Sequence, residues 1–168
     1  MMRTSTKDPI NFRFTRSYRG FSFVLSIVIA MALRIMPLPL EWSVYNPDWV
    51  LLTLFYWWLL IPERVGVGSA WVIGLFCDVL TGRLLGQYAL SYSIIAYVSV
   101  KLHRRLRQFF LLQQMVFIIF MLLLSQLLIY WTEDTRASIE MYRDYWLPSL
   151  TGAMVWPLLL IGLRKLSM

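Results

Sequence analysis

The sequence predicts an all-α integral membrane protein whose six transmembrane helices form one bundle. Of its 168 residues 59% are apolar, which leaves too little polar sequence to cover a soluble globule. The apolar residues gather in six runs with short connections, and no run has the alternating ten-residue pattern of a membrane β-strand. The predicted helices occupy about residues 20–36, 47–61, 65–80, 84–100, 109–131 and 146–163. A basic segment at 1–19 precedes this domain, and a short C-terminus at 164–168 follows it.

Prolines explain several of the breaks between these runs. Pro37 and Pro39 end the first helix, and Pro62 ends the second, because proline supplies no amide to continue the helix. Asn46 followed by Pro47 is typical of a cap and a first-turn proline, so we expect the second helix to begin there. The first apolar run is not followed by a small-residue cleavage site, and we therefore expect it to remain as a membrane helix.

The second and third runs are short, and the sequence predicts a tight hairpin of two helices from Asn46 to Gly86. Helical residues 47–61 would extend only about 22 Å at ~1.5 Å per residue, against a hydrocarbon core of ~30 Å. Either neighbouring helices shield this pair or the bilayer is thinner there. A re-entrant hairpin is a third interpretation.

The distribution of charge predicts the topology. With six spans and a cytoplasmic N-terminus, 12 of the 16 basic residues fall on the inner side, as the positive-inside rule requires. Both termini are then cytoplasmic, and most acidic residues, Asp48 among them, fall outside. Because the cations adjoin apolar runs, we expect contact with membrane lipids and no binding of nucleic acid. Six arginines are candidates for contact with the inner leaflet: Arg13, Arg16, Arg19, Arg104, Arg105 and Arg107. A cytoplasmic protein could use the N-terminal part of this surface instead.

Polar residues within the predicted spans define a candidate site. Arg34 and Asp78 reach the same depth, about 20 Å from the inner ends of their helices, and Gln126 lies about one turn further out. An ionised side chain in hydrocarbon requires a partner, so a link between Arg34 and Asp78 is one prediction. Locally, Arg34 could extend to the membrane surface while Asp78 pairs with Arg83. A role in moving an ion is the remaining alternative.

Small residues form a second pattern, typical of helices that pack closely in lipid. The candidate packing residues are Gly66, Gly68, Ser69, Gly74, Gly82 and Gly86. No G-K-[ST] follows the G-V-G-S motif, which argues against a nucleotide-binding loop. A single cysteine, Cys77, and a single histidine, His103, give no constellation for a metal or for catalysis. We therefore expect no cofactor and no enzymatic activity.

Aromatic residues flank the predicted loop between the last two helices. They are Tyr130, Trp131, Tyr142, Tyr145 and Trp146. Such residues are typical of anchors at the membrane–water interface, and a binding cage is the alternative interpretation.

Three consecutive motifs resemble the rod-shape-determining protein MreD family of bacteria. They are P-D-W-V-L-L-T-L-F-Y-W-W-L-L-I-P-E-R-V-G-V-G, G-L-F-C-D-V-L-T-G-R-L-L-G and A-L-S-Y-S-I-I-A-Y. An I-M-P-x-P ending of the first helix and a V-W-P motif in the last helix agree with the same family. Asp78 matches the family's G-x-x-x-D position, and the family offers no catalytic role to carry over.

This resemblance implies a subunit of the inner-membrane machinery that elongates rod-shaped cells. Its implied partners are an MreC-like membrane protein, MreB, RodZ, RodA and a penicillin-binding transpeptidase. The six-helix plan is also similar to the substrate-binding subunits of energy-coupling-factor transporters. We therefore expect a scaffold that couples the MreB filament to peptidoglycan synthesis, and the alternative is a small-molecule-binding subunit of a transporter.

Overall fold

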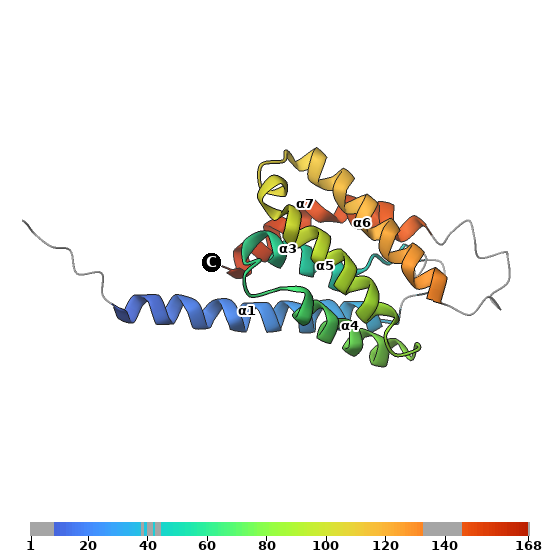
Figure 1. Ribbon diagram of the computed structural model, residues 1–168, viewed down its shortest axis with the longest axis horizontal. Coiled ribbons are helices and arrows are strands. Elements are labelled where there is room, and N and C mark those ends of the chain that lie inside the picture. The colour runs from blue at the N-terminus through green and yellow to red at the C-terminus, as the bar shows by residue number, and fades with distance from the viewer. Residues whose placement is uncertain (1–8, 38, 40–41, 43–44, 133–145, 168) are drawn as a thin grey trace, which may run out of the picture.

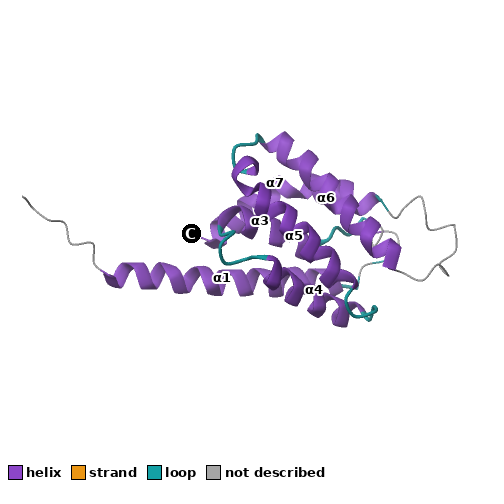
Figure 2. Cartoon of the chain, in the orientation of Figure 1, coloured by secondary structure: helices purple, strands orange, loops and turns teal. Residues whose placement is uncertain are grey.

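The structure, a computed structural model, describes residues 9–37, 39, 42, 45–132 and 146–167. For residues 9–19 and 164–167 it describes the helical backbone only. Within this part of the chain the structure consists of helices and connecting loops without strands, which confirms the all-helical prediction (Figure 2). The helices are α1 (Pro9–Ile35), α3 (Trp49–Leu60), α4 (Val67–Thr81), α5 (Gln87–Leu106), α6 (Leu111–Thr132) and α7 (Leu147–Ser167).

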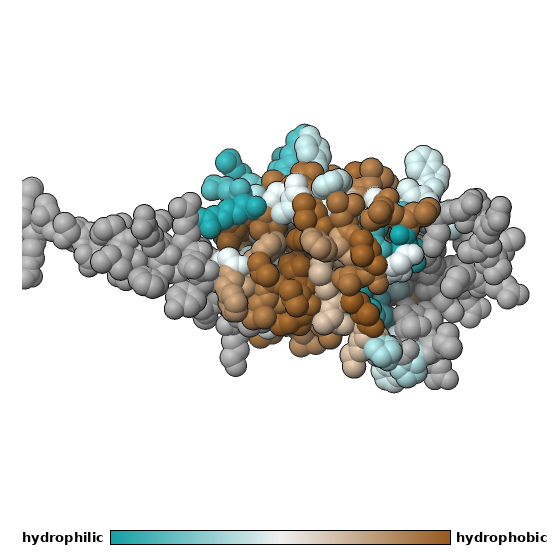
Figure 3. All heavy atoms as spheres, turned by 90° about the horizontal axis from the view of Figure 1, so that it is seen from below, coloured by the Kyte–Doolittle hydropathy of each residue, from teal (hydrophilic) through white to brown (hydrophobic). Residues whose placement is uncertain are grey.

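Consecutive helices run in alternating directions along one common axis (Figure 1). The start of α1, the α3–α4 loop, the α5–α6 loop and the end of α7 lie at one end of the bundle, which we call the basic end. The end of α1, the start of α3, the α4–α5 loop, the end of α6 and the start of α7 lie at the opposite end, the joint end. Figure 3 shows an apolar belt across the described surface, with hydrophilic side chains gathered towards the two ends. This arrangement is typical of a protein that crosses a bilayer.

Among the described helices one, α6, is long and apolar enough to cross a membrane by length and composition alone. The apolar parts of four others are shorter: Gly20–Ile35, Trp49–Leu60, Val67–Thr81 and Leu147–Leu163. Helix α5 has 20 residues, but basic residues occupy its last turn.

The short helix α3 forms the centre of the bundle. Nine consecutive residues, Val50 to Trp58, are buried, and a helix that is apolar on all sides requires such burial. Phe23 of α1 packs edge-on against Trp57, and Phe117 of α6 packs in the same way against Phe55. The indole of Trp57 also donates a hydrogen bond to Ser26 Oγ of α1 at 2.9 Å. Neighbouring helices therefore shield the short helix α3, which is one of the alternatives that the sequence left open.

The predicted hairpin of the second and third helices is wrong. Helix α3 packs against α1, α5 and α7, whereas α4 packs chiefly against α5. Helices α4 and α5 approach so closely at Gly74 that a Cβ atom there would lie 2.4 Å from Ala89 Cα. Only glycine permits this backbone contact, so α4 and α5 form the hairpin that the sequence assigned to α3 and α4.

The boundaries differ most where charged residues adjoin the apolar runs. Helix α1 begins at Pro9 and continues without a break past residue 20, so its first turns extend beyond the bundle (Figure 1). Helix α5 continues to Leu106 through His103, Arg104 and Arg105, since cations in the last turn interact favourably with the helix dipole. The prediction from hydropathy began the first helix after these charges and ended the fourth helix before them.

Candidate functional site

Asp48 connects three helices at the joint end. It is the N-cap of α3, where its Oδ1 accepts a hydrogen bond from the amide of Leu51 at 3.1 Å. The same oxygen lies 2.7 Å from Arg34 Nη1 of α1. The hydroxyl of Tyr92 on α5 lies 2.9 Å and 2.8 Å from the two carboxylate oxygens and donates to them. We call Arg34, Asp48 and Tyr92 the Asp48 joint.

The aromatic ring of Tyr88 extends this cluster on α5. Arg34 lies over it, with Cζ 4.3 Å from the ring centroid, and Arg83 approaches it at 5.8 Å. Tyr88 also packs against Tyr92, with ring centroids 5.6 Å apart. The guanidinium of Arg34 therefore has an anion and a π face as neighbours, and both stabilise a cation in a medium of low polarity.

Asp78 connects α4 to α5 through backbone groups. Its fully buried carboxylate accepts hydrogen bonds from the amides of Tyr88 at 2.8 Å, Gly86 at 2.9 Å and Ala89 at 3.4 Å. These amides belong to the N-terminus of α5, which has positive partial charge and open hydrogen-bond donors. We call Asp78, Gly86, Tyr88 and Ala89 the Asp78 joint.

Two glycines shape the turn that makes the Asp78 joint possible. Gly82 has φ +63° and caps α4, with its amide directed to Asp78 O and Val79 O. Gly86 has φ +106° and precedes α5. Other residues rarely adopt this left-handed backbone, so both glycines serve the turn rather than helix packing.

The direct link between Arg34 and Asp78 is wrong, because Arg34 pairs with Asp48. The two residues nevertheless share a neighbour, Tyr88. Arg34 lies over its ring, and Asp78 accepts a hydrogen bond from its amide. The hydrogen bond found between Arg83 and Asp78 joins backbone atoms, at 3.1 Å.

Gln126 forms a separate polar contact between α6 and α7. Its Oε1 accepts a hydrogen bond from the hydroxyl of Ser149 at 2.7 Å. Nearby, Ser91 of α5 and Ser125 of α6 share a buried hydrogen bond of 2.9 Å. Such bonds between membrane helices each stabilise a pair by about 0.6 kcal/mol on average.

The remaining predicted residues divide by exposure. A Cβ atom at Gly66 or Gly68 would meet nothing within 4 Å, so these two glycines do not hold α4 against its neighbours. The hydroxyl of Ser69 donates a hydrogen bond to the carbonyl oxygen of Gly66 in the same turn. Arg104, Arg105 and Arg107 are exposed at the basic end. The side chains of Arg13, Arg16 and Arg19 lie outside the described part of the structure.

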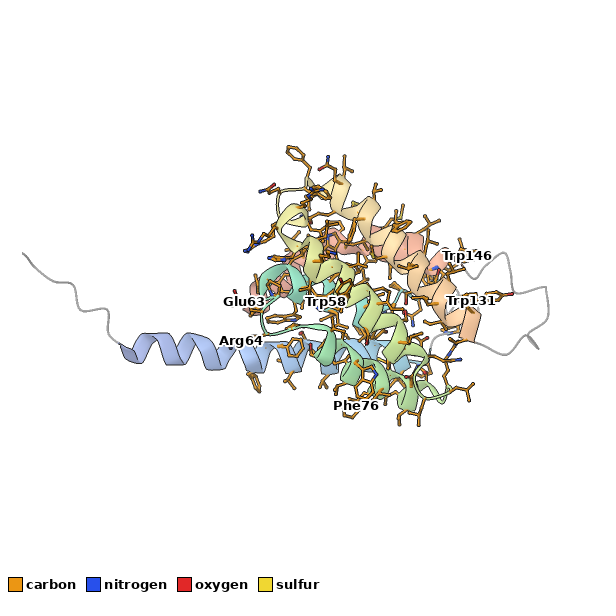
Figure 4. All side chains as sticks on the ribbon, in the orientation of Figure 1. Trp58, Glu63, Arg64, Phe76, Trp131 and Trp146 are labelled. Carbon is orange, nitrogen blue, oxygen red and sulfur yellow. The ribbon has the colours of Figure 1, made fainter. Side chains whose placement is uncertain are left out.

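The described residues include three of the five aromatic residues predicted as membrane anchors: Tyr130, Trp131 and Trp146. Trp131 is 86% exposed and lies with Trp146 at the joint end, opposite Glu63 and Arg64 (Figure 4). Tyr130 is also exposed, and Tyr142 and Tyr145 lie outside the described residues.

Sequence reasoning missed Asp48, Tyr92 and Gly152. Charge bias placed Asp48 in an outer loop, and the cap was assigned to Asn46, which instead accepts a hydrogen bond from Trp49 Nε1 at 2.7 Å. An acid directly before an apolar run was the available signal for an N-cap. A Cβ atom at Gly152 of α7 would lie 2.7 Å from Leu122 Cδ1, a contact with no local signal in the sequence.

The geometry of this region is that of fixed joints between helices. Among the described residues, no group of three or more histidine, cysteine or acidic side chains could hold a metal ion. Both aspartates instead direct their oxygens at donors within the chain.

Comparisons with known proteins agree with the motifs. The family model described as rod shape-determining protein MreD matches residues 15–166. A rod shape-determining protein MreD from Haemophilus influenzae is 29% identical over 146 residues, covering 87% of this chain and 90% of the relative. No solved structure matches the chain. The predicted likeness to energy-coupling-factor subunits therefore stays a prediction.

Proposed function

The chain belongs to the rod shape-determining protein MreD family, and we propose that it acts there as a non-enzymatic membrane scaffold. In this proposal it binds the single membrane helix of an MreC-like partner and couples the MreB cytoskeleton to peptidoglycan synthesis. RodZ, RodA and a penicillin-binding transpeptidase are the further partners that the family resemblance implies. The role in determining rod shape comes from the family itself.

The observation that carries the scaffold proposal is the unequal burial of α4. One face contacts α5 so closely that Gly74 is required, and the opposite face exposes Val72, Phe76 and Val79. Phe76 points away from the bundle in Figure 4 and is 59% exposed. Near the start of the same helix, Gly68 leaves open space. A membrane helix of a partner could approach α4 closely on this face, because small residues permit close contact between backbones.

Cross-linking in cells tests this partner surface. A photoreactive residue replacing Val72 or Phe76 on α4 should capture an MreC-like protein. Phe120 on α6 is a matched control, since it is apolar and equally exposed. Capture from Phe120 alone, or from neither helix, would contradict the proposed surface.

Depletion of the protein tests the wider role. Rod-shaped cells should become spherical if the chain supports side-wall synthesis. A vitamin-sized ligand that co-purifies with the protein, with cell shape unchanged, would favour the transporter subunit instead.

We also propose that the chain crosses the inner membrane six times with both termini in the cytoplasm. The alternating helix directions and the cations at the basic end support this topology. Reporter fusions at residue 140 and at the C-terminus should then report opposite compartments. Signals from the same compartment would exclude six spans in this orientation.

A further inference from the structure

One exposed stripe of α5 changes from apolar to cationic along the helix axis. Leu90, Ile94, Tyr97 and Lys101 recur every three or four residues and therefore lie on one side of the helix. All four are exposed, and Leu90 and Tyr97 are 49% and 58% exposed. Arg104 and Arg105 continue the stripe at the basic end and are exposed as well.

These cations differ from Arg34 in their surroundings. Arg34 has Asp48 as its anion, whereas Lys101, Arg104 and Arg105 have no acidic partner among the described residues. Glu63 is the acid that the described chain places at this end, and it adjoins Arg64 in the sequence. The stripe therefore presents uncompensated positive charge directly beside apolar surface.

Tyr97 marks the boundary between the two parts of the stripe. Lys101 Nζ lies 5.7 Å from the centroid of the Tyr97 ring, which gives a cation–π contact. Tyrosine is enriched at the level where hydrocarbon meets headgroups, because its ring is apolar and its hydroxyl is polar. The four residue steps from Lys101 to Arg105 then rise about 6 Å, similar to the ~5–8 Å depth of one headgroup layer.

We propose that this stripe is a binding site for an anionic phospholipid of the leaflet at the basic end. Lys101, Arg104 and Arg105 bind the headgroup phosphate, and the acyl chains lie along Tyr97, Ile94 and Leu90. The order of chemistry along α5 matches the order within one lipid molecule, from charged headgroup to hydrocarbon. An acidic protein segment would use the cations but not the apolar half of the stripe. The proposal is independent of the scaffold function and of which compartment faces the basic end.

Native mass spectrometry of the full-length protein in detergent tests the site with two probes. Phosphatidylglycerol should remain bound more strongly than phosphatidylcholine with the same acyl chains. In R104Q/R105Q the affinity for phosphatidylglycerol should fall by roughly fivefold for each arginine removed. The affinity for phosphatidylcholine should fall by less, because its choline cation offsets the charge of its phosphate. R104K/R105K keeps the charge and should retain most of the binding.

The matched control is R164Q/K165Q, which removes two cations from the end of α7, at the same end of the bundle. It should leave phosphatidylglycerol binding within about twofold of the unaltered protein if the site is local to α5, because surface charge acts over about one Debye length. Equal losses in R104Q/R105Q and R164Q/K165Q would overturn the proposal. Equal binding of the two lipids by the unaltered protein would do so too.

A second measurement needs no variant. A photoreactive phosphatidylglycerol bound to the unaltered protein should label a peptide within residues 90–108. Labelling confined to residues 9–19 or to α7 would place the lipid elsewhere and overturn the assignment to α5.

Discussion

The Asp48 joint and the Asp78 joint each place an aspartate at the N-terminus of a helix, but they use different donors. Asp48 is balanced by a guanidinium and a phenol from two other helices. Asp78 is balanced by three amides of α5. The first joint therefore depends on side-chain identity at several positions. The second depends on one side chain and on the path of the backbone, so the two should respond differently to substitution.

The largest effect is expected for Asp78→Ala. The substitution leaves the amides of Gly86, Tyr88 and Ala89 without this acceptor. Each buried amide that loses its hydrogen bond lowers the free energy of unfolding by roughly 1–3 kcal/mol. We expect the free energy of unfolding to fall by about 3 kcal/mol or more, measured by titration of the protein in mild detergent with a denaturing detergent. Glu63→Ala, at an exposed acid, should change it by less than about 0.5 kcal/mol. A similar small change for both variants would show that the Asp78 joint is not structural.

The next effect concerns the contact that holds α4 against α5. Gly74→Ala forces a Cβ atom against the backbone of Ala89, and overpacking of this kind lowers the free energy of unfolding by about 1–3 kcal/mol. Gly68→Ala is the matched control in the same helix, where the space is open. It should be neutral or stabilising by up to about 1 kcal/mol, because alanine favours helix. The same unfolding titration compares them, and an equal response of the two glycines would exclude close packing at Gly74.

A double-mutant cycle distinguishes the true partner of Arg34. Arg34→Met combined with Asp48→Asn should reveal a coupling energy of about 1–3 kcal/mol, as residues in direct contact do. Arg34→Met combined with Asp78→Asn should give a smaller coupling energy, because these two residues share only the neighbour Tyr88. Unfolding free energies of the single and double variants supply both values. A larger coupling to Asp78 than to Asp48 would restore the pairing predicted from equal depth.

The smallest effect is expected within the Asp48 joint. Tyr92→Phe removes the hydroxyl that bridges both oxygens of Asp48, and a hydrogen bond to a charged group contributes roughly 1.5–3 kcal/mol. Because Arg34 and the amide of Leu51 still neutralise Asp48, we expect the lower end of this range in thermal or denaturant unfolding. Tyr97→Phe is the control, at an exposed ring, and should change the unfolding free energy by less than about 0.5 kcal/mol. Equal losses in both variants would mean that the Tyr92 hydroxyl contributes nothing specific.

Hydropathy predicted the existence of each helix because every helix contains a long apolar run. It also identified Asp78 as a residue that must have a partner. The partner could not be predicted, because backbone amides occur in nearly every residue and the sequence does not indicate which of them bind Asp78. Arg34 was assigned to Asp78 by depth alone, and depth does not say which helices are neighbours. Asp48 was overlooked because the charge rule counts an acid near a helix end as a loop residue.

The central position of α3 has a consequence for how the protein is made. This helix has almost no surface of its own, and α7 supplies part of its cover: at Gly152 a Cβ atom would lie 3.7 Å from Leu52 Cδ1 and 3.4 Å from Pro47 Cβ. During synthesis α3 emerges roughly 90 residues before α7, which at ~5–20 residues per second is several seconds or more. Throughout that interval the part of α3 around Leu52 requires a temporary cover of lipid or insertion factors. The nascent chain therefore reaches its final packing only when its last helix enters the membrane.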